Sequence, residues 1–234
     1  MTTRHVLGNG TPIQVVGSPD APRALIVLQE AFGVNDHIRS IAQRFADEGY
    51  YVVAPELFHR TGSPEISYDD YAQAGPAMGS LDPEGLEEDV SAAATFLEAA
   101  GYATASIGVV GYCMGGSVSL YADTLGVVGA AASFYGGGVA AGRFGLPPLV
   151  ELAPELRAPW LGLYGDADQG IPPEQVEALR AAAATSGVAT EVVRYPEAGH
   201  GFNCDARPAN YNAAAAADAT ARTLAFFADH LAAR

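Results

Sequence analysis

The sequence predicts an α/β fold in which a mostly parallel central sheet carries helices on both faces. Short apolar runs of strand length alternate with segments of helical period along the chain, and these runs are continuous rather than alternating. Continuous apolar runs are typical of strands buried on both faces, which is the setting of a parallel sheet. Neither a linker nor a fixed repeat interrupts the order, so we expect one domain over residues 1–234, without a large lid domain.

The expected elements follow from local signals in chain order. Strands are expected at residues 24–29, 51–54, 106–111, 127–134, 159–164 and 190–195. Helices are expected at residues 36–48, 82–101, 114–123, 173–184 and 209–230. Asn35 can cap the first helix, and Asp82-Pro83-Glu84 supplies the cap, the proline and the acidic first turn of the second. Residues 58–80 are the least regular segment, and long irregular loops are often functional.

Composition and charge exclude several classes of function. The 234 residues are 49% hydrophobic and carry a formal charge of −15, which argues against disorder, nucleic-acid binding and attraction to an anionic membrane. All 12 basic residues are arginines. The absence of lysine excludes a Schiff-base lysine, a Ser–Lys dyad and a P-loop lysine.

Other features predict a cytoplasmic protein without cofactors or metals. The first residues lack the apolar region of a signal peptide, and no apolar run reaches the length of about 18 residues that spans a bilayer. Cys113 and Cys204 lie far apart, and neither the cysteines nor the five histidines show metal-ligand spacing. Gly136-Gly137-Gly138 does not match a dinucleotide-binding motif. The oligomeric state stays open between a monomer and a small homo-oligomer.

The best candidate for chemistry follows the strand at residues 106–111. Gly111-Tyr-Cys-Met-Gly-Gly116 has the glycine spacing of a nucleophile elbow, with Cys113 in the nucleophile's position. A thiol there lies at a helix N-terminus, whose partial positive charge favours the thiolate, and the Met114 amide would donate to an oxyanion. The alternative is a buried structural cysteine in a tight turn. The strand before it and the helix after it favour the nucleophile.

Two further strand ends carry an acid and a base. Asp166 and Asp168 follow the strand at 159–164, and we favour Asp168 as the partner of a histidine, with Asp166 bracing the loop. His200 follows the strand at 190–195 between two glycines, where a core histidine is not expected. The order Cys113, Asp168, His200 matches the nucleophile–acid–base order of α/β-hydrolases, which predicts thiolate attack on an ester and an acyl-enzyme.

These motifs resemble the dienelactone hydrolase family (carboxymethylenebutenolidases) of the α/β-hydrolases, from about Arg23 to Leu231. The resemblance rests on five blocks: Gln29-Glu-Ala-Phe-Gly-Val-Asn35, Ala54-Pro-Glu-Leu-Phe58, Gly111-Tyr-Cys-Met-Gly-Gly116, Gly165-Asp-Ala-Asp168 with Ile171-Pro172, and Gly199-His-Gly-Phe202. It implies an α/β-hydrolase fold and hydrolysis of a carboxylate-bearing enol-lactone in the breakdown of aromatic compounds.

The resemblance also assigns roles to residues of the first block. It implies that Glu30 is a carboxylate that controls the protonation and orientation of the Cys113 thiol, and that Ala31 is the second oxyanion donor. The alternative for Glu30 is a capping or surface carboxylate. Phe32, Tyr68 and Tyr71 are candidates to line the substrate pocket, although the two tyrosines can equally well only pack.

The chain departs from the family pattern in its arginines. Family members use arginines for the substrate carboxylate, one of them in the segment after the Ala54–Phe58 block, but no arginine lies between Arg60 and Arg143 here. Arg60 and Arg207 are the remaining candidates, and a charge of −15 makes a local arginine necessary for an anionic substrate. The alternatives are hydrolysis of another small ester, lactone or thioester, or a non-catalytic binding protein on the same fold.

Overall fold

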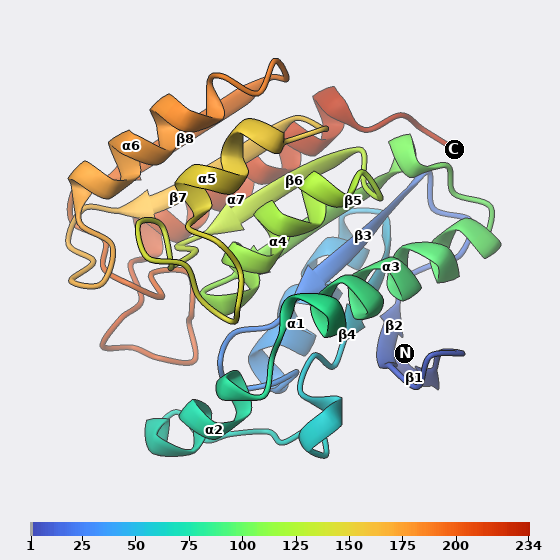
Figure 1. The fold of residues 1–234 in the computed structure, drawn as a ribbon. Coiled ribbons are helices and arrows are strands. Elements are labelled where there is room, and N and C mark those ends of the chain that lie inside the picture. The colour runs from blue at the N-terminus through green and yellow to red at the C-terminus, as the bar shows by residue number, and fades with distance from the viewer. Residues whose placement is uncertain (1) are drawn as a thin grey trace.

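The computed structural model describes residues 2–234 and consists of an eight-stranded sheet with helices on both faces (Figure 1). The strands are β1 Thr3–Val6, β2 Pro12–Val16, β3 Arg23–Leu28, β4 Tyr50–Pro55, β5 Ile107–Tyr112, β6 Ala130–Phe134, β7 Trp160–Gly165 and β8 Thr190–Tyr195. Their order across the sheet is β1-β2-β4-β3-β5-β6-β7-β8. All neighbours from β4 to β8 are parallel, so the predicted fold class is confirmed.

The helices cover the sheet in two layers. They are α1 Asp36–Asp47, α2 Ala74–Gly79, α3 Pro83–Ala99, α4 Met114–Leu125, α5 Leu149–Leu152, α6 Pro173–Ala183 and α7 Ala213–His230, with short 3₁₀ turns at His59–Thr61, Tyr71–Gln73, Thr104–Ser106 and Ala153–Glu155. Helices α3 to α6 lie along one face, and α1 and α7 lie on the other (Figure 1). The predicted caps form: Asn35 accepts a hydrogen bond from the Ile38 amide, and Asp82 accepts one from Gly85.

Two antiparallel strands at the N-terminal end of the sheet, β1 and β2, were not predicted from the sequence. Every residue of β1 is exposed, so it lacks the apolar run by which the other strands are recognised. Among the described residues, β1 pairs only with β2, which in turn pairs with β4. The irregular segment at 58–80 also contains α2, and the last helix begins four residues later than expected, at Ala213.

The core places the functional residues at one edge of the sheet. Strands β3, β5, β6 and β7 are buried almost throughout, because helices cover both their faces. Since these strands are parallel, their carboxyl ends lie at a common edge. The segments that follow them begin at Gln29, Cys113, Tyr135 and Asp166, so the predicted motifs converge there.

None of the helices in residues 2–234 is long and apolar enough to cross a membrane.

Candidate active site

Cys113 occupies a strained turn between β5 and α4. Its backbone has a φ of 54° and a ψ of −112°, a conformation that a non-glycine residue rarely adopts. Glycine is required on both sides: a Cβ on Gly111 would lie 1.8 Å from the Gly115 carbonyl oxygen, and one on Gly115 would lie 2.5 Å from the Leu28 oxygen. The turn therefore depends on close backbone packing that side chains would prevent.

The side chains of Cys113, His200 and Asp168 form a contiguous row. His200 Nε2 lies 3.1 Å from Cys113 Sγ, and His200 Nδ1 donates to Asp168 Oδ2 at 2.7 Å. Asp168 is buried, and its other oxygen accepts from the Gly170 amide at 2.8 Å. Three segments far apart in the sequence thus meet at the carboxyl edge of the sheet. The arrangement places a thiol, an imidazole and a carboxylate in contact, the set of groups that nucleophilic catalysis uses.

The electrostatics of the row favour a protonated imidazole. Burial is the largest influence on the pKa of His200 and lowers it, but the charge of Cys113 and the hydrogen bond to Asp168 act in the opposite direction. The net result raises the pKa of His200 to about 10. The contacts with Cys113 and Asp168 therefore favour the protonated form of the His200 ring.

The competing acid, Asp166, serves a different contact. Its Oδ1 accepts from Arg194 Nε at 2.6 Å, and Arg194 also contacts Glu177. Asp166 and Asp168 lie at the same strand end, but only Asp168 contacts the imidazole in the structure of residues 2–234.

Two backbone amides near Cys113 have no acceptor within residues 2–234. These are the N–H groups of Met114, the first residue of α4, and Ala31, which follows β3. Both residues are buried, and buried N–H groups without a partner are rare. Each of these N–H groups is available to an acceptor from outside the described residues.

Glu30 is buried beside the row and contacts a residue that the sequence analysis missed. The Tyr135 hydroxyl donates to Glu30 Oε1 at 3.3 Å, and the Tyr135 ring lies edge-on to the His200 ring at 5.2 Å. Tyr135 directly follows β6 and has a φ of 41°. Its place after a buried strand was the available signal, but a tyrosine there also fits simple core packing. In the described residues, Glu30 has no direct hydrogen bond to Cys113.

Four of the five predicted substrate-binding residues lie close together, and the fifth, Arg60, does not. Phe32, Tyr68 and Arg207 pack together: the Phe32 and Tyr68 rings meet edge-on at 4.5 Å, and the Arg207 guanidinium lies over both rings at 5.3 and 5.4 Å. The Tyr71 ring lies 5.9 Å from Phe32.

Arg60 lies apart from this aromatic group. It pairs with Asp89 at 2.8 Å and Glu88 at 3.1 Å, both on α3. The structure therefore does not bring Arg60 to the triad.

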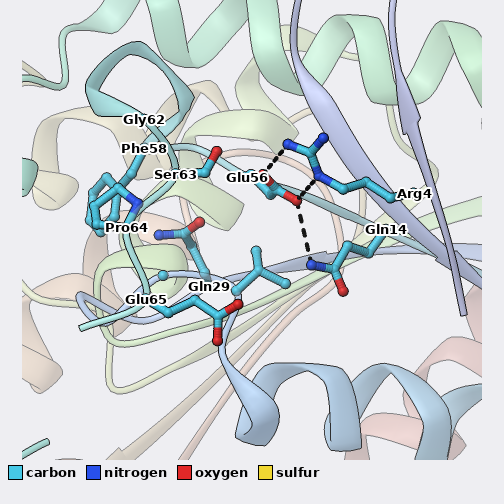
Figure 2. Close-up of a pocket in the computed structure, with 11 residues that line it drawn as sticks. Arg4, Gln14, Gln29, Glu56, Phe58, Gly62, Ser63, Pro64 and Glu65 are labelled. Carbon is cyan, nitrogen blue, oxygen red and sulfur yellow. Dashed lines mark hydrogen bonds and ion pairs between the residues drawn. The ribbon is translucent and has the colours of Figure 1, made fainter. Parts of the chain in front are cut away.

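Two cavities lie near the carboxyl edge of the sheet. Figure 2 shows the smaller, of about 310 Å³, where Arg4 and Gln14 contact Glu56 and where no triad residue is part of the lining. The larger, of about 610 Å³, is lined by His200 and Asp168, by Tyr71 and by the loop 137–143. We take the larger cavity as the candidate substrate site because His200 and Asp168 line it.

Arg143 is a second residue that the sequence analysis missed. It lines the larger cavity, is exposed, and lies against the backbone of Gly137 and Gly138. Unlike Arg60, it forms no ion pair with an acid of residues 2–234. The signal in the sequence was weak, since nothing local distinguishes Arg143 from a surface arginine.

Comparison with known proteins decides the family. The model of the dienelactone hydrolase family matches residues 14–231. The chain belongs to the dienelactone hydrolase family. It is therefore a hydrolase of carboxylic esters, and its α/β-hydrolase fold agrees with that of its solved relatives.

Individual relatives of this dienelactone hydrolase family member cover nearly the whole chain. A Salmonella typhimurium protein named "Putative carboxymethylenebutenolidase" is 37% identical over 91% of the chain and 79% of its own length. The carboxymethylenebutenolidase of Pseudomonas putida is 32% identical, with 92% and 89% covered. A crystal structure titled "Putative Dienelactone Hydrolase", from Klebsiella pneumoniae, has a TM-score of 0.85 at 31% identity and covers 98% of this chain and 99% of its own.

Proposed function

We propose that the protein opens a small enol-lactone that carries a carboxylate, with Cys113 as the nucleophile and an acyl-enzyme as the intermediate. The observation that carries this proposal is the row from Cys113 Sγ through the His200 ring to Asp168, with distances of 3.1 and 2.7 Å. Family membership supports hydrolysis of a lactone ester, and the row supports the choice of thiolate chemistry.

The steps follow from the positions of these groups. The Cys113 thiolate attacks the lactone carbonyl, and the amides of Met114 and Ala31 receive the oxygen that becomes negative. The ring C–O bond breaks, and the leaving enolate oxygen takes the proton of the His200 imidazolium. His200 then takes a proton from a water molecule, whose oxygen attacks the thioester; the acid is released and the thiolate–imidazolium pair is regenerated. Asp168 keeps the imidazole in the required tautomer throughout.

Glu30 is proposed as a positioning residue. It acts on the row through Tyr135, which contacts both Glu30 and His200, and its negative charge disfavours a second negative charge at the sulfur. We expect Glu30→Gln to change the pH dependence of kcat/KM more than its maximum value, whereas a purely structural role would leave the profile unshifted.

For the substrate carboxylate, we propose Arg143 ahead of the two arginines that the sequence suggested. Arg60 is already bound to Asp89 and Glu88, and Arg207 is held over two aromatic rings. Arg143 lines the same cavity as His200 and has its charge free to meet an anion. In a chain with a formal charge of −15, such a local cation is needed to offset long-range repulsion.

The first experiment tests the nucleophile. Iodoacetamide should label Cys113 before the buried Cys204 and abolish hydrolysis of p-nitrophenyl acetate. Cys113→Ala should lose this activity, and Cys204→Ala is the matched control that should retain most of it. Turnover that survives in Cys113→Ala would mean that another group is the nucleophile.

The second experiment tests the substrate class. Dienelactones and uncharged lactones are compared on the unmodified protein, on Arg143→Ala and on Arg157→Ala, the last being an arginine that lies against Gly126, remote from the cavity lining. Loss of a charge-assisted contact of about 1.5 kcal/mol predicts a roughly tenfold higher KM for the dienelactone in Arg143→Ala only. If the unmodified protein prefers uncharged lactones, the carboxylate proposal is wrong and another small ester or lactone is the substrate.

A further inference from the structure

Glu30, His37 and Cys204 form a buried cluster. The proposed reaction uses Glu30 as a positioning residue but assigns no role to the three residues together. Glu30 follows β3, His37 lies in the first turn of α1, and Cys204 follows the His200 loop. One ligand atom of each side chain lies within 4.8 Å of the ligand atoms of the other two, and the three residues are 1%, 3% and 0% exposed. Carboxylate, imidazole and thiolate are the three ligand types that zinc accepts in proteins.

Two donor atoms in this cluster have no hydrogen-bond partner among the residues that the structure describes. They are Glu30 Oε2 and His37 Nε2, both inaccessible to solvent. Buried polar atoms without a partner cost free energy, so each such atom requires an explanation. A common explanation is a ligand that both atoms can reach.

Each of the three side chains also contacts a neighbouring polar group. His37 Nδ1 lies 3.1 Å from Asp205 Oδ1, Cys204 Sγ lies 3.4 Å from the Tyr68 hydroxyl, and the Tyr135 hydroxyl donates to Glu30 Oε1. The Asp205 contact is the most informative, since a metal-bound histidine usually donates its other ring N–H to a carboxylate. With the proton on Nδ1, the lone pair of Nε2 is left for a cation.

We propose that Glu30, His37 and Cys204 form a binding site for a divalent transition-metal ion of the zinc class. In a tetrahedral site, bonds of about 2.0–2.3 Å place donor atoms about 3.3–3.6 Å apart, so the three side chains need to converge only slightly. Binding forms one bond each to Oε2, Nε2 and Sγ, and the Cys204 thiol releases its proton to solvent. Glu30 and the thiolate together balance the charge of the ion, and a water molecule can complete the coordination.

The identity of the ligands predicts which ions bind. A site with one sulfur and one nitrogen donor selects Zn²⁺ or Co²⁺ over Mg²⁺ and Ca²⁺, which take oxygen ligands. The site is distinct from the triad, although the two share the segment around Glu30. Because the cluster is buried, an ion enters when a neighbouring segment moves. Half-buried Tyr68, which contacts Cys204, lies in the long connection between β4 and α3.

The test uses Co²⁺, whose bond to a thiolate gives a near-ultraviolet charge-transfer band. The titration is made on Cys113→Ser, so that the catalytic sulfur cannot supply the band. We expect one equivalent of Co²⁺ to produce it, Zn²⁺ to abolish it by displacement, and a large excess of Mg²⁺ to leave it unchanged. The additional substitution Cys204→Ser should remove the band.

A second variant does not depend on changing the buried ligands. Asp205 is partly exposed, so Asp205→Asn should fold, and loss of its contact with His37 should weaken Co²⁺ binding by about 10- to 100-fold. Asp36→Asn is the control: Asp36 lies on the surface of α1, the helix that carries His37, and its substitution should leave the affinity for Co²⁺ unchanged. The proposal is overturned if Cys113→Ser gives no charge-transfer band, or if the band survives Cys204→Ser. An unchanged affinity in Asp205→Asn would also overturn the assignment of His37.

Discussion

Replacing Asp168 by asparagine tests the proposed mechanism most directly. Asp168 Oδ1 accepts from the Gly170 amide at 2.8 Å, and Oδ2 accepts from His200 Nδ1 at 2.7 Å. In Asp168→Asn the Gly170 amide retains the side-chain oxygen, so the new NH₂ group faces Nδ1. Two donors cannot face each other, and the imidazole proton therefore moves to Nε2. That nitrogen then cannot take the proton of the Cys113 thiol.

The size of the effect follows from these contacts. A hydrogen bond to a buried charged group contributes about 1.5–3 kcal/mol, which corresponds to a loss of about 10- to 150-fold in rate. The wrong tautomer adds to this, and the same substitution lowers kcat by about 10⁴ in a Ser–His–Asp triad. We therefore expect kcat/KM for p-nitrophenyl acetate to fall by about 10²- to 10⁴-fold at neutral pH.

Asp166→Asn is the matched control because it removes a carboxylate two residues away at the same strand end. Asp166 contacts Arg194 rather than the imidazole, and the pair is partly exposed, so its loss should change kcat/KM by less than about threefold. Equal losses in the two variants, or a loss below about threefold in Asp168→Asn, would refute the assignment of Asp168 as the orienting acid.

Three further predictions concern stability and protonation. Arg4 holds the pKa of Glu56 at about 2, below its ordinary value of 4.5, so the stabilisation is complete above pH 4.5 and is lost as the pH falls toward 2. Glu56→Gln should therefore cost about 1 kcal/mol in urea unfolding at pH 7, since Arg4 is half exposed, and the difference should shrink at pH 3. Gly111→Ala should destabilise the protein by about 3 kcal/mol or more in the same assay, whereas Gly75→Ala, where a Cβ meets nothing within 4 Å, should be nearly neutral. NMR should detect deprotonation of the His200 ring near pH 10. Because the pKa of His200 is raised on folding, its contribution to stability is complete below pH 6.5 and is lost as the pH rises toward 10. A titration midpoint near 6.5 would contradict the contacts with Cys113 and Asp168.

Most strands and helices could be predicted from the sequence because the signals for them are local. The apolar runs of β3 to β7, the caps at Asn35 and Asp82, and the glycines around Cys113 each act within a few residues, and each predicted element forms. Strand β1 was missed because each of its residues is exposed and its place is fixed by pairing with β2. The strand propensity of single residues does not indicate which strand pairs with which.

The candidate site was less predictable where the answer depends on side-chain direction. Asp166 and Asp168 are equivalent as strand-end acids, and only the folded chain shows that one meets Arg194 and the other His200. Arg60 was a reasonable candidate by position, but Asp89 and Glu88 on α3 occupy it. No sequence pattern distinguishes Arg143, because its candidacy depends on the cavity that its loop forms with residues far away in the sequence, such as Asp168 and His200.

The buried cluster lies on two segments of the chain, and one of them also carries the histidine of the triad row. Residues 30–37 provide Glu30 and His37, and residues 200–205 provide His200 and Cys204. The first segment follows β3 and the second follows β8. A buried carboxylate at Glu30 is expensive, and the hydroxyl of Tyr135 alone satisfies only one of its oxygens. The other oxygen therefore needs a proton, a cation or a substrate group, and the Co²⁺ titration distinguishes the cation from the other two.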